Sequence, residues 1–195
     1  PDFIDIHYNN FHWFTFNVAD IFITIGVIFL IILEFIGSNK MKGVEVGILK
    51  GPTFKSLMIT CPNLTLTGVD TFIPDIIWKS RKIENTEELL QIEPGYWYQE
   101  LLDFCKDYDG RANLIRNFSN KAVNEFKDES LDFVFIDASH DFHSVDEDIY
   151  LWKSKVKKGG MVSGHDIDLL QVKMAVSNHK TNFKTGPDNV WWWTK

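Results

Sequence analysis

The sequence lacks the features that mark several protein classes. Its two cysteines, Cys61 and Cys105, are too few and too far apart for a disulfide framework or a cysteine metal motif. Lys and Arg number 20 against 27 Asp and Glu, for a net charge of −7. The basic stretch 153–158 is short, and we expect it to be solvated charge at a helix end. The chain therefore predicts packed thiols in a reducing cytoplasm and no nucleic-acid partner.

The first 39 residues contain no Lys or Arg. The uncharged run Ile21–Leu33 is shorter than the span of about 20 residues that crosses a bilayer. A signal peptide would need a basic start, which is missing. We expect residues 1–39 to form an apolar N-terminal segment with a helix that covers one face of a sheet. The alternative is membrane contact through residues 18–36, which would leave the rest of the chain on the cytoplasmic side, next to Lys40 and Lys42.

Residues 40–195 have the pattern of one α/β domain. The whole chain has 195 residues, of which 45% are hydrophobic and 24% charged, as in ordinary globular proteins. Short apolar runs alternate with amphipathic ones, which predicts a parallel sheet with helices on both faces. The expected strands are Gly43–Val46, Leu64–Val69, Ala112–Arg116, Leu131–Ile136, Gly160–Ser163 and Val190–Trp193. The expected helices are Thr53–Thr60, Gly95–Asp107, Lys121–Phe126, Val145–Lys155 and Leu169–His179.

Residues with chemical potential follow the ends of these strands. In such sheets, ligands bind beyond the carboxyl ends of the strands. Glu45, Gly47 and Gly51 follow the first strand, where glycines allow a tight turn and close approach of a ligand. Asp70 ends the second strand, 25 positions after Glu45, where a carboxylate can accept ribose hydroxyls.

The later strands bring a second group of polar residues to the same edge. Asp137 ends the strand Leu131–Ile136, whose apolar run is typical of a strand covered on both faces. His140 follows closely. His165 and Asp166 end the strand that begins after the turn at Gly159 and Gly160.

Together these motifs resemble the class I S-adenosylmethionine (SAM)-dependent methyltransferases over roughly residues 35–195. The wording of residues 135–140 and 159–166 is similar to macrocin-type sugar O-methyltransferases and their glycan-methylating relatives. The resemblance implies a doubly wound, mostly parallel seven-stranded sheet, the Rossmann-like methyltransferase fold, with helices on both faces and the last strand antiparallel.

The resemblance also implies roles for individual positions. Glu45, Gly47 and Gly51 would form the loop under the methionine part of SAM, and Asp70 would bind the ribose. The stretch Asn117, Phe118 and Ser119 would lie near the adenine, and Asp137 with Ala138 would close the site near the sulfonium. Metal-dependent members hold Mg²⁺ with carboxylates that correspond to Asp137 and Asp166. Residues 48–50 depart from the pattern, because many members have a further glycine there.

The expected reaction is methyl transfer to a hydroxyl of a sugar or other small molecule. A hydroxyl needs a base, a metal or both. His165 is our preferred base, with His140 as the alternative and Asp137 beside them. The long connection 71–94 is expected to cover the acceptor.

Three other functions remain open from the sequence. A metal-dependent hydrolase could use Asp137, His140, His165 and Asp166. A nicotinamide-dependent oxidoreductase could share the glycine loop, but no Tyr is followed by Lys four residues later, as the short-chain type needs. A non-catalytic, membrane-linked domain would keep the fold and use its N-terminal segment for attachment.

Overall fold

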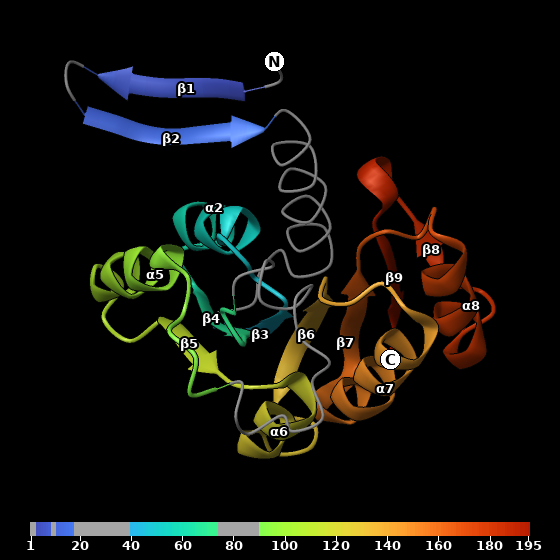
Figure 1. Ribbon diagram of the computed structural model, residues 1–195. Coiled ribbons are helices and arrows are strands. Elements are labelled where there is room, and N and C mark those ends of the chain that lie inside the picture. The colour runs from blue at the N-terminus through green and yellow to red at the C-terminus, as the bar shows by residue number, and fades with distance from the viewer. Residues whose placement is uncertain (1–2, 9–10, 18–39, 74–89) are drawn as a thin grey trace.

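The computed structural model describes residues 3–8, 11–17, 40–73 and 90–195 (Figure 1). The strands are β1 (Phe3–Tyr8), β2 (Phe11–Asn17), β3 (Met41–Val46), β4 (Leu64–Asp70), β5 (Ala112–Arg116), β6 (Leu131–Ile136), β7 (Val156–Gly164), β8 (Lys184–Thr185) and β9 (Trp191–Thr194). The α-helices are α2 (Pro52–Thr60), α5 (Tyr96–Lys106), α6 (Ser119–Ala122), α7 (Phe142–Lys155) and α8 (Leu170–His179). Short 3₁₀ helices cover Val123–Glu125 and Pro187–Asn189.

The main sheet has seven strands in the order β5-β4-β3-β6-β7-β9-β8. The five strands β3 to β7 all run parallel to one another. Strand β9 runs antiparallel to both of its neighbours, β7 and β8. The strand order reverses between β3 and β6. These two strands pair side by side, although β4 and β5 lie between them in the sequence. The predicted fold class is confirmed, with the crevice at this reversal as the expected ligand site.

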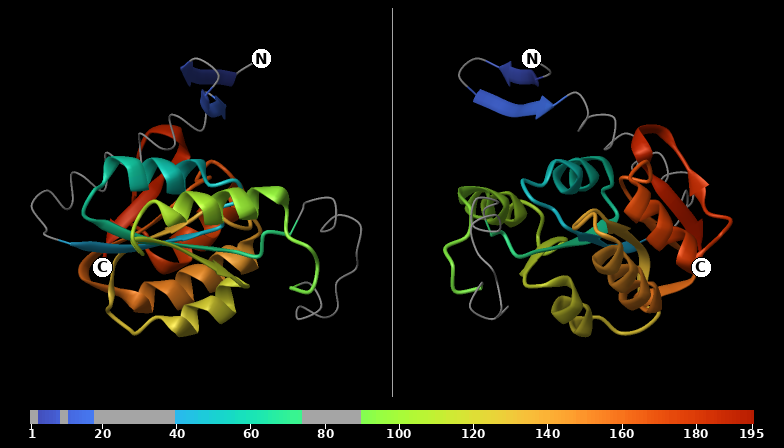
Figure 2. Two further views of the ribbon diagram at one scale, coloured as in Figure 1. Left: turned by 90° about the vertical axis from the view of Figure 1, so that its left-hand side faces the viewer. Right: turned by 45° about the vertical axis from the view of Figure 1, so that its right-hand side comes forward.

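Helices cover both faces of the sheet, as Figure 2 shows with the sheet seen nearly edge-on. Strand β6 explains how two cores form, because its successive side chains point to opposite faces. Phe133 and Phe135 pack on the side of α2 and α5, and Val134 and Ile136 pack on the side of α7 and α8. The prediction that this strand is buried on both faces is confirmed.

Several predicted boundaries need correction. Helix α7 begins at Phe142 rather than Val145, because the Asp141 side chain caps it by accepting a hydrogen bond from Ser144 N at 3.1 Å. Strand β7 begins at Val156 and runs through the glycine pair that was expected to precede it. The helix predicted over residues 121–126 is one short turn of α-helix from Ser119 followed by a 3₁₀ turn.

The N-terminal part contains two strands that the sequence did not lead us to expect. Strands β1 and β2 pair antiparallel, with a register shift between Ile6 and His7. The predicted helix within residues 1–39 and the membrane contact through residues 18–36 lie outside the described residues. Within the described ranges, no helix is long and apolar enough to cross a membrane.

Candidate functional site

The glycine loop after β3 is closed tightly against the end of β6. Gly47 has a left-handed φ of 84°, and its N–H donates to the Val69 carbonyl at 2.8 Å. A Cβ atom on Gly47 would lie 2.2 Å from the backbone oxygen of Asp137 and 2.5 Å from Cα of Ala138. Gly51 has a φ of 73° and precedes α2, and a Cβ there would lie 2.5 Å from Leu101 Cδ2. Both positions require glycine.

Asp70 joins this loop from the end of β4. Its Oδ2 accepts hydrogen bonds from the N–H groups of Ile48 at 3.0 Å and Leu49 at 2.9 Å, and its Oδ1 accepts one from Phe72 N at 2.7 Å. A carboxylate offers about four acceptor positions. Three are occupied here, so Oδ1 retains one for a ligand.

Glu45 is a buried acid within the same crevice. It is 2% exposed, and its Oε2 has no hydrogen-bond partner in the part of the chain that the structure describes. Burial raises the pKa of Glu45 well above its usual value, and the negative charges of Asp137 and Asp70 raise this pKa further. The raised pKa favours the protonated form of Glu45, which offers one O–H donor.

The loop after β5 reaches the crevice through its main chain. Asn117 N donates to the Asp70 carbonyl at 3.0 Å, and Asn117 Oδ1 accepts from Phe118 N at 2.9 Å. The Ser119 hydroxyl points instead to α7, where it donates to Asp148 Oδ1 at 2.5 Å and accepts from Trp152 Nε1 at 2.7 Å. Any contact of this loop with an adenine would thus come from its main chain and Phe118.

Acids and histidines cluster where β6 and β7 end. His140 Nε2 lies 2.7 Å from Asp166 Oδ2, and His165 Nδ1 lies 2.9 Å from Asp166 Oδ1. Asp137 Oδ1 lies 3.9 Å from the same His165 nitrogen. One ligand atom each from Asp137, His140 and Asp166 lies within 4.8 Å of the others, close enough to hold one cation.

The two histidines of this cluster differ in access to a ligand. The His140 side chain is 52% exposed, whereas that of His165 is 10% exposed. Burial acts to lower the pKa of His165, but the hydrogen bond to Asp166 and the charges of Asp137 and Asp166 outweigh it and raise this pKa to about 9. His165 Nε2 is buried without a hydrogen-bond partner among the described residues. His165 is therefore a protonated, enclosed imidazole near neutral pH.

The structure brings most of the predicted site residues to one edge of the sheet. Gly47 adjoins Asp137 and Ala138, Asp70 binds the glycine loop, and Asp166 joins both histidines. The sequence analysis missed Asp148, which is buried and holds Ser119. A sequence signal was present, because Asp148 lies at helical spacing from the buried Val145 and Trp152.

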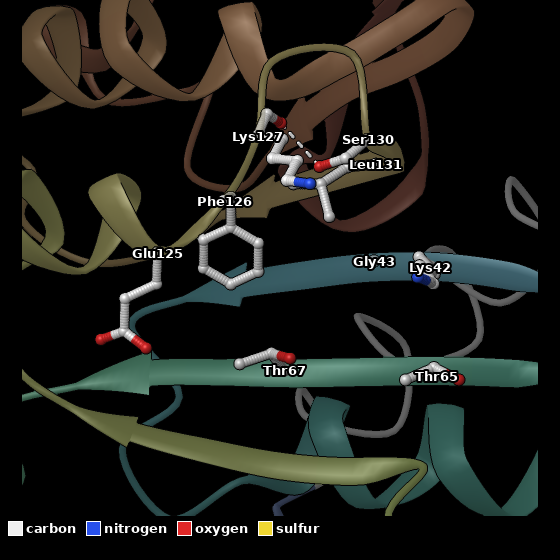
Figure 3. A pocket seen from close by; sticks show the side chains of 9 residues that line it. All are labelled: Lys42, Gly43, Thr65, Thr67, Glu125, Phe126, Lys127, Ser130 and Leu131. Atoms are coloured by element: carbon white, nitrogen blue, oxygen red, sulfur yellow. Dashed lines mark hydrogen bonds between the residues drawn. The ribbon is translucent and has the colours of Figure 1, made fainter.

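A separate groove of about 430 Å³ lies at the opposite end of the strands. Figure 3 shows the Phe126 ring facing β3, and the hydrogen bond from Ser130 Oγ to the Lys127 carbonyl, which is 2.6 Å long. Its lining residues are Lys42, Gly43, Thr65, Thr67, Glu125, Phe126, Lys127, Ser130 and Leu131. None of the predicted site residues lines it.

Comparison with known proteins assigns the main domain. A family model described as a methyltransferase domain matches residues 44–167. Among solved structures, the calicheamicin methyltransferase CalS11 has a TM-score of 0.58 at 13% identity, over 86% of this chain and 76% of that one. A putative caffeoyl-CoA O-methyltransferase from Staphylococcus aureus has a TM-score of 0.55 at 15% identity, over 90% and 80%. At these identities the two structures support the fold.

The N-terminal segment is similar to a different family. A model described as signal peptidase II matches residues 1–36. A lipoprotein signal peptidase of Pelagibacter ubique is 68% identical over 40 residues, which are 20% of this chain and 24% of that protein. That of Blochmanniella pennsylvanica is 54% identical over 41 residues, 20% and 25% of the two chains. The chain thus spans about a quarter of the length of these curated relatives.

Proposed function

Because the chain belongs to the methyltransferase-domain family through residues 44–167, we propose that it transfers a methyl group from SAM to a hydroxyl of a sugar or other small molecule. The observation that carries the proposal is the closure of Gly47 against Asp137 and Ala138, beside Asp70. This contact brings together three parts of the chain that are far apart in the sequence, around Gly47, Asp70 and Asp137. The fold neighbours include a TDP-rhamnose 3′-O-methyltransferase, which supports an O-linked acceptor and a sugar as its class.

The polar groups at the carboxyl ends of β3, β4 and β6 suit the parts of SAM. Gly47 lets the loop after β3 pack directly against the main chain that follows β6, where any side chain would collide with Asp137 and Ala138. Glu45 Oε2, buried without a partner among the described residues, faces the same strand ends, and Asp70 Oδ1 keeps one acceptor position for a ribose hydroxyl. The segment 117–119 lies next to Asp70, on the adenine side of this proposal. When bound, SAM supplies an electrophilic methyl group on its sulfonium.

We assign proton removal from the acceptor to His140, which was the alternative base in the sequence analysis. A base must carry no proton and must reach the acceptor. His165 meets neither condition near neutral pH, because its pKa is about 9 and its Nε2 is buried. His140 is half-exposed and is oriented by Asp166 through one ring nitrogen, as in a His–carboxylate pair. In the absence of a metal ion, the charged form of His165 would instead pair with the carboxylates of Asp137 and Asp166.

A magnesium ion remains part of the proposal. Carboxylate oxygens suit Mg²⁺, and Asp137 and Asp166 are the two residues that would hold it. An ion there would act as a Lewis acid on the acceptor hydroxyl. Calorimetric titration with MgCl₂ should give binding that is lost in Asp166→Asn, and equal heats for both proteins would remove the ion from the proposal.

The test of the cofactor site is calorimetric titration with S-adenosylhomocysteine. We expect the wild type to bind and Asp70→Ala to lose affinity by at least about tenfold, since the variant also frees the N–H groups of Ile48 and Leu49. Asp107→Ala removes an exposed acid after α5 and should bind as the wild type does. Equal affinity of Asp70→Ala and wild type would contradict this assignment.

Location and partners belong to the same proposal. We expect the domain to work in the cytoplasm, where SAM is found, on a small-molecule or glycan acceptor and without nucleic acid. Transfer of a labelled methyl group to nucleotide sugars, measured beside a nucleic-acid acceptor, tests the substrate class. Labelling of nucleic acid alone would contradict it.

A further inference from the structure

A buried polar network links the loop after β5 to helix α7. The Ser119 hydroxyl donates to Asp148 Oδ1 at 2.5 Å and accepts from Trp152 Nε1 at 2.7 Å. Asp148 is 6% exposed and Trp152 is fully buried. The Ser119 hydroxyl thus donates one hydrogen bond to a side chain of α7 and accepts one from another.

The same loop is tied to Asp70 at its other end. Asn117 N donates to the Asp70 carbonyl at 3.0 Å, and Asn117 Oδ1 fixes the N–H of Phe118 at 2.9 Å. The loop of residues 117–119 is therefore held between the main chain of Asp70 and α7. Helix α7 itself starts at Phe142, directly after the strand end that carries Asp137 and His140.

Asp148 is a costly residue for a purely structural position. Burial is the main cause that raises the pKa of Asp148 to about 6, and the nearby charges of Glu147 and Asp141 contribute to this rise. The hydrogen bond from Ser119 acts in the opposite direction. A buried acid without a cation contributes less stability than an apolar residue of similar size. Its geometric effect, in contrast, is specific, because it fixes the direction of one hydroxyl.

We infer that Asp148 is a positioning residue for the cofactor site, acting through Ser119 on the main chain of residues 117–119. The inference rests on the proposed function, since it concerns the affinity for SAM and its product. Asp148 does not touch the cofactor in this account. Its removal releases the Ser119 hydroxyl and lets the loop move away from Asp70, which weakens cofactor binding and raises the KM for SAM, with kcat little changed.

The experiment is calorimetric titration of four folded variants with S-adenosylhomocysteine, with melting temperatures measured in parallel. Asp148→Ala and Ser119→Ala should each raise Kd by about tenfold, since both break the same contact. Asp148→Asn keeps an oxygen that accepts from Ser119 and should stay within about threefold of the wild type. Ile149→Ala, on the same helix and fully buried, should lower the melting temperature while Kd stays within about twofold.

The outcomes separate this inference from the proposed function. If the wild type does not bind S-adenosylhomocysteine, the proposed function fails. If the wild type binds and Ser119→Ala binds equally well, Asp148 has no positioning role. The inference is also overturned if Ile149→Ala weakens binding as much as Asp148→Ala, because loss of helix stability then explains both. Should Asp148→Ala not fold, Ser119→Ala and Asp148→Asn still decide the question.

Discussion

The two edges of the sheet use polar residues in different ways. At the amino edge, each carboxylate oxygen of Asp132 has a partner, with Lys157 Nζ at 2.7 Å from Oδ1 and Lys42 N at 2.7 Å from Oδ2. At the carboxyl edge, Glu45 Oε2 is buried and lacks a hydrogen-bond partner among the residues described. Polar groups that are buried and unpaired cost stability, so their presence at one edge marks where a ligand is expected.

Glycines at the two edges differ in the same way. Gly47 and Gly159 both have left-handed φ angles, of 84° and 78°. A Cβ on Gly159 would meet nothing within 4 Å, whereas a Cβ on Gly47 would collide with the main chain of Asp137 and Ala138. Gly159 lies inside β7 with open space around it, whereas Gly47 also holds two strand ends together. Gly159 is thus favoured only by its backbone conformation, whereas Gly47 is required both by its conformation and by the close approach of neighbouring main chain.

The largest expected effect comes from adding a side chain at Gly47, where the main chain of Asp137 and Ala138 already fills the space. Gly47→Ala should raise the Kd for S-adenosylhomocysteine by at least about 100-fold, because either the loop or the end of β6 must move. Gly159→Ala shares the conformational strain of about 1–2 kcal/mol but not the collision. Its Kd should match the wild type in the same calorimetric titration. Equal loss in both variants would show that strain alone, and not the edge, matters.

Removing the assigned base should slow turnover next most strongly. His140→Ala should lower kcat by about 100-fold or more while the affinity for S-adenosylhomocysteine is retained. His143 is an exposed histidine on the first turn of α7, and His143→Ala should leave kcat unchanged. Steady-state kinetics with labelled SAM measures both. A normal kcat in His140→Ala would remove this residue from the reaction.

Asp148 predicts a pH dependence of stability. Its pKa in the folded protein is about 6, above its ordinary value of 3.8, so the folded state holds this proton more tightly than the unfolded state. The contribution of this group to stability is therefore full below about pH 4 and is lost as pH rises to about 6, by about 3 kcal/mol at most. Urea unfolding should show this decline in the wild type and its absence in Asp148→Asn. Identical pH slopes for the two proteins would contradict the assignment.

The smallest effect is expected at the amino edge. Asp132→Asn weakens a partly exposed ion pair with Lys157 and should lower the free energy of unfolding by about 1 kcal/mol. Binding of S-adenosylhomocysteine should not change. A clear loss of affinity in this variant would show that the two edges are not independent.

The sequence predicted what local pattern and strand direction determine. Apolar runs located β5 and β6 at their observed bounds, and the rule that ligands meet the carboxyl ends of strands brought Asp137 and Asp166 to one place. The contact between Ser119 and Asp148, 29 residues apart, depends on side-chain directions that no periodicity encodes. The enclosure of His165 was also missed, because it depends on side chains packed around it, including Trp191, whose Nε1 donates to the His165 carbonyl at 2.9 Å.

Photochemical cross-linking of SAM labelled in its methyl group tests most directly whether the nucleoside site lies at the carboxyl edge. After proteolysis, the account predicts label in peptides that contain Gly47, Asp70, Phe118 or Asp137, suppressed by excess S-adenosylhomocysteine. Label confined to peptides of the opposite groove, around Thr65 or Phe126, would contradict it.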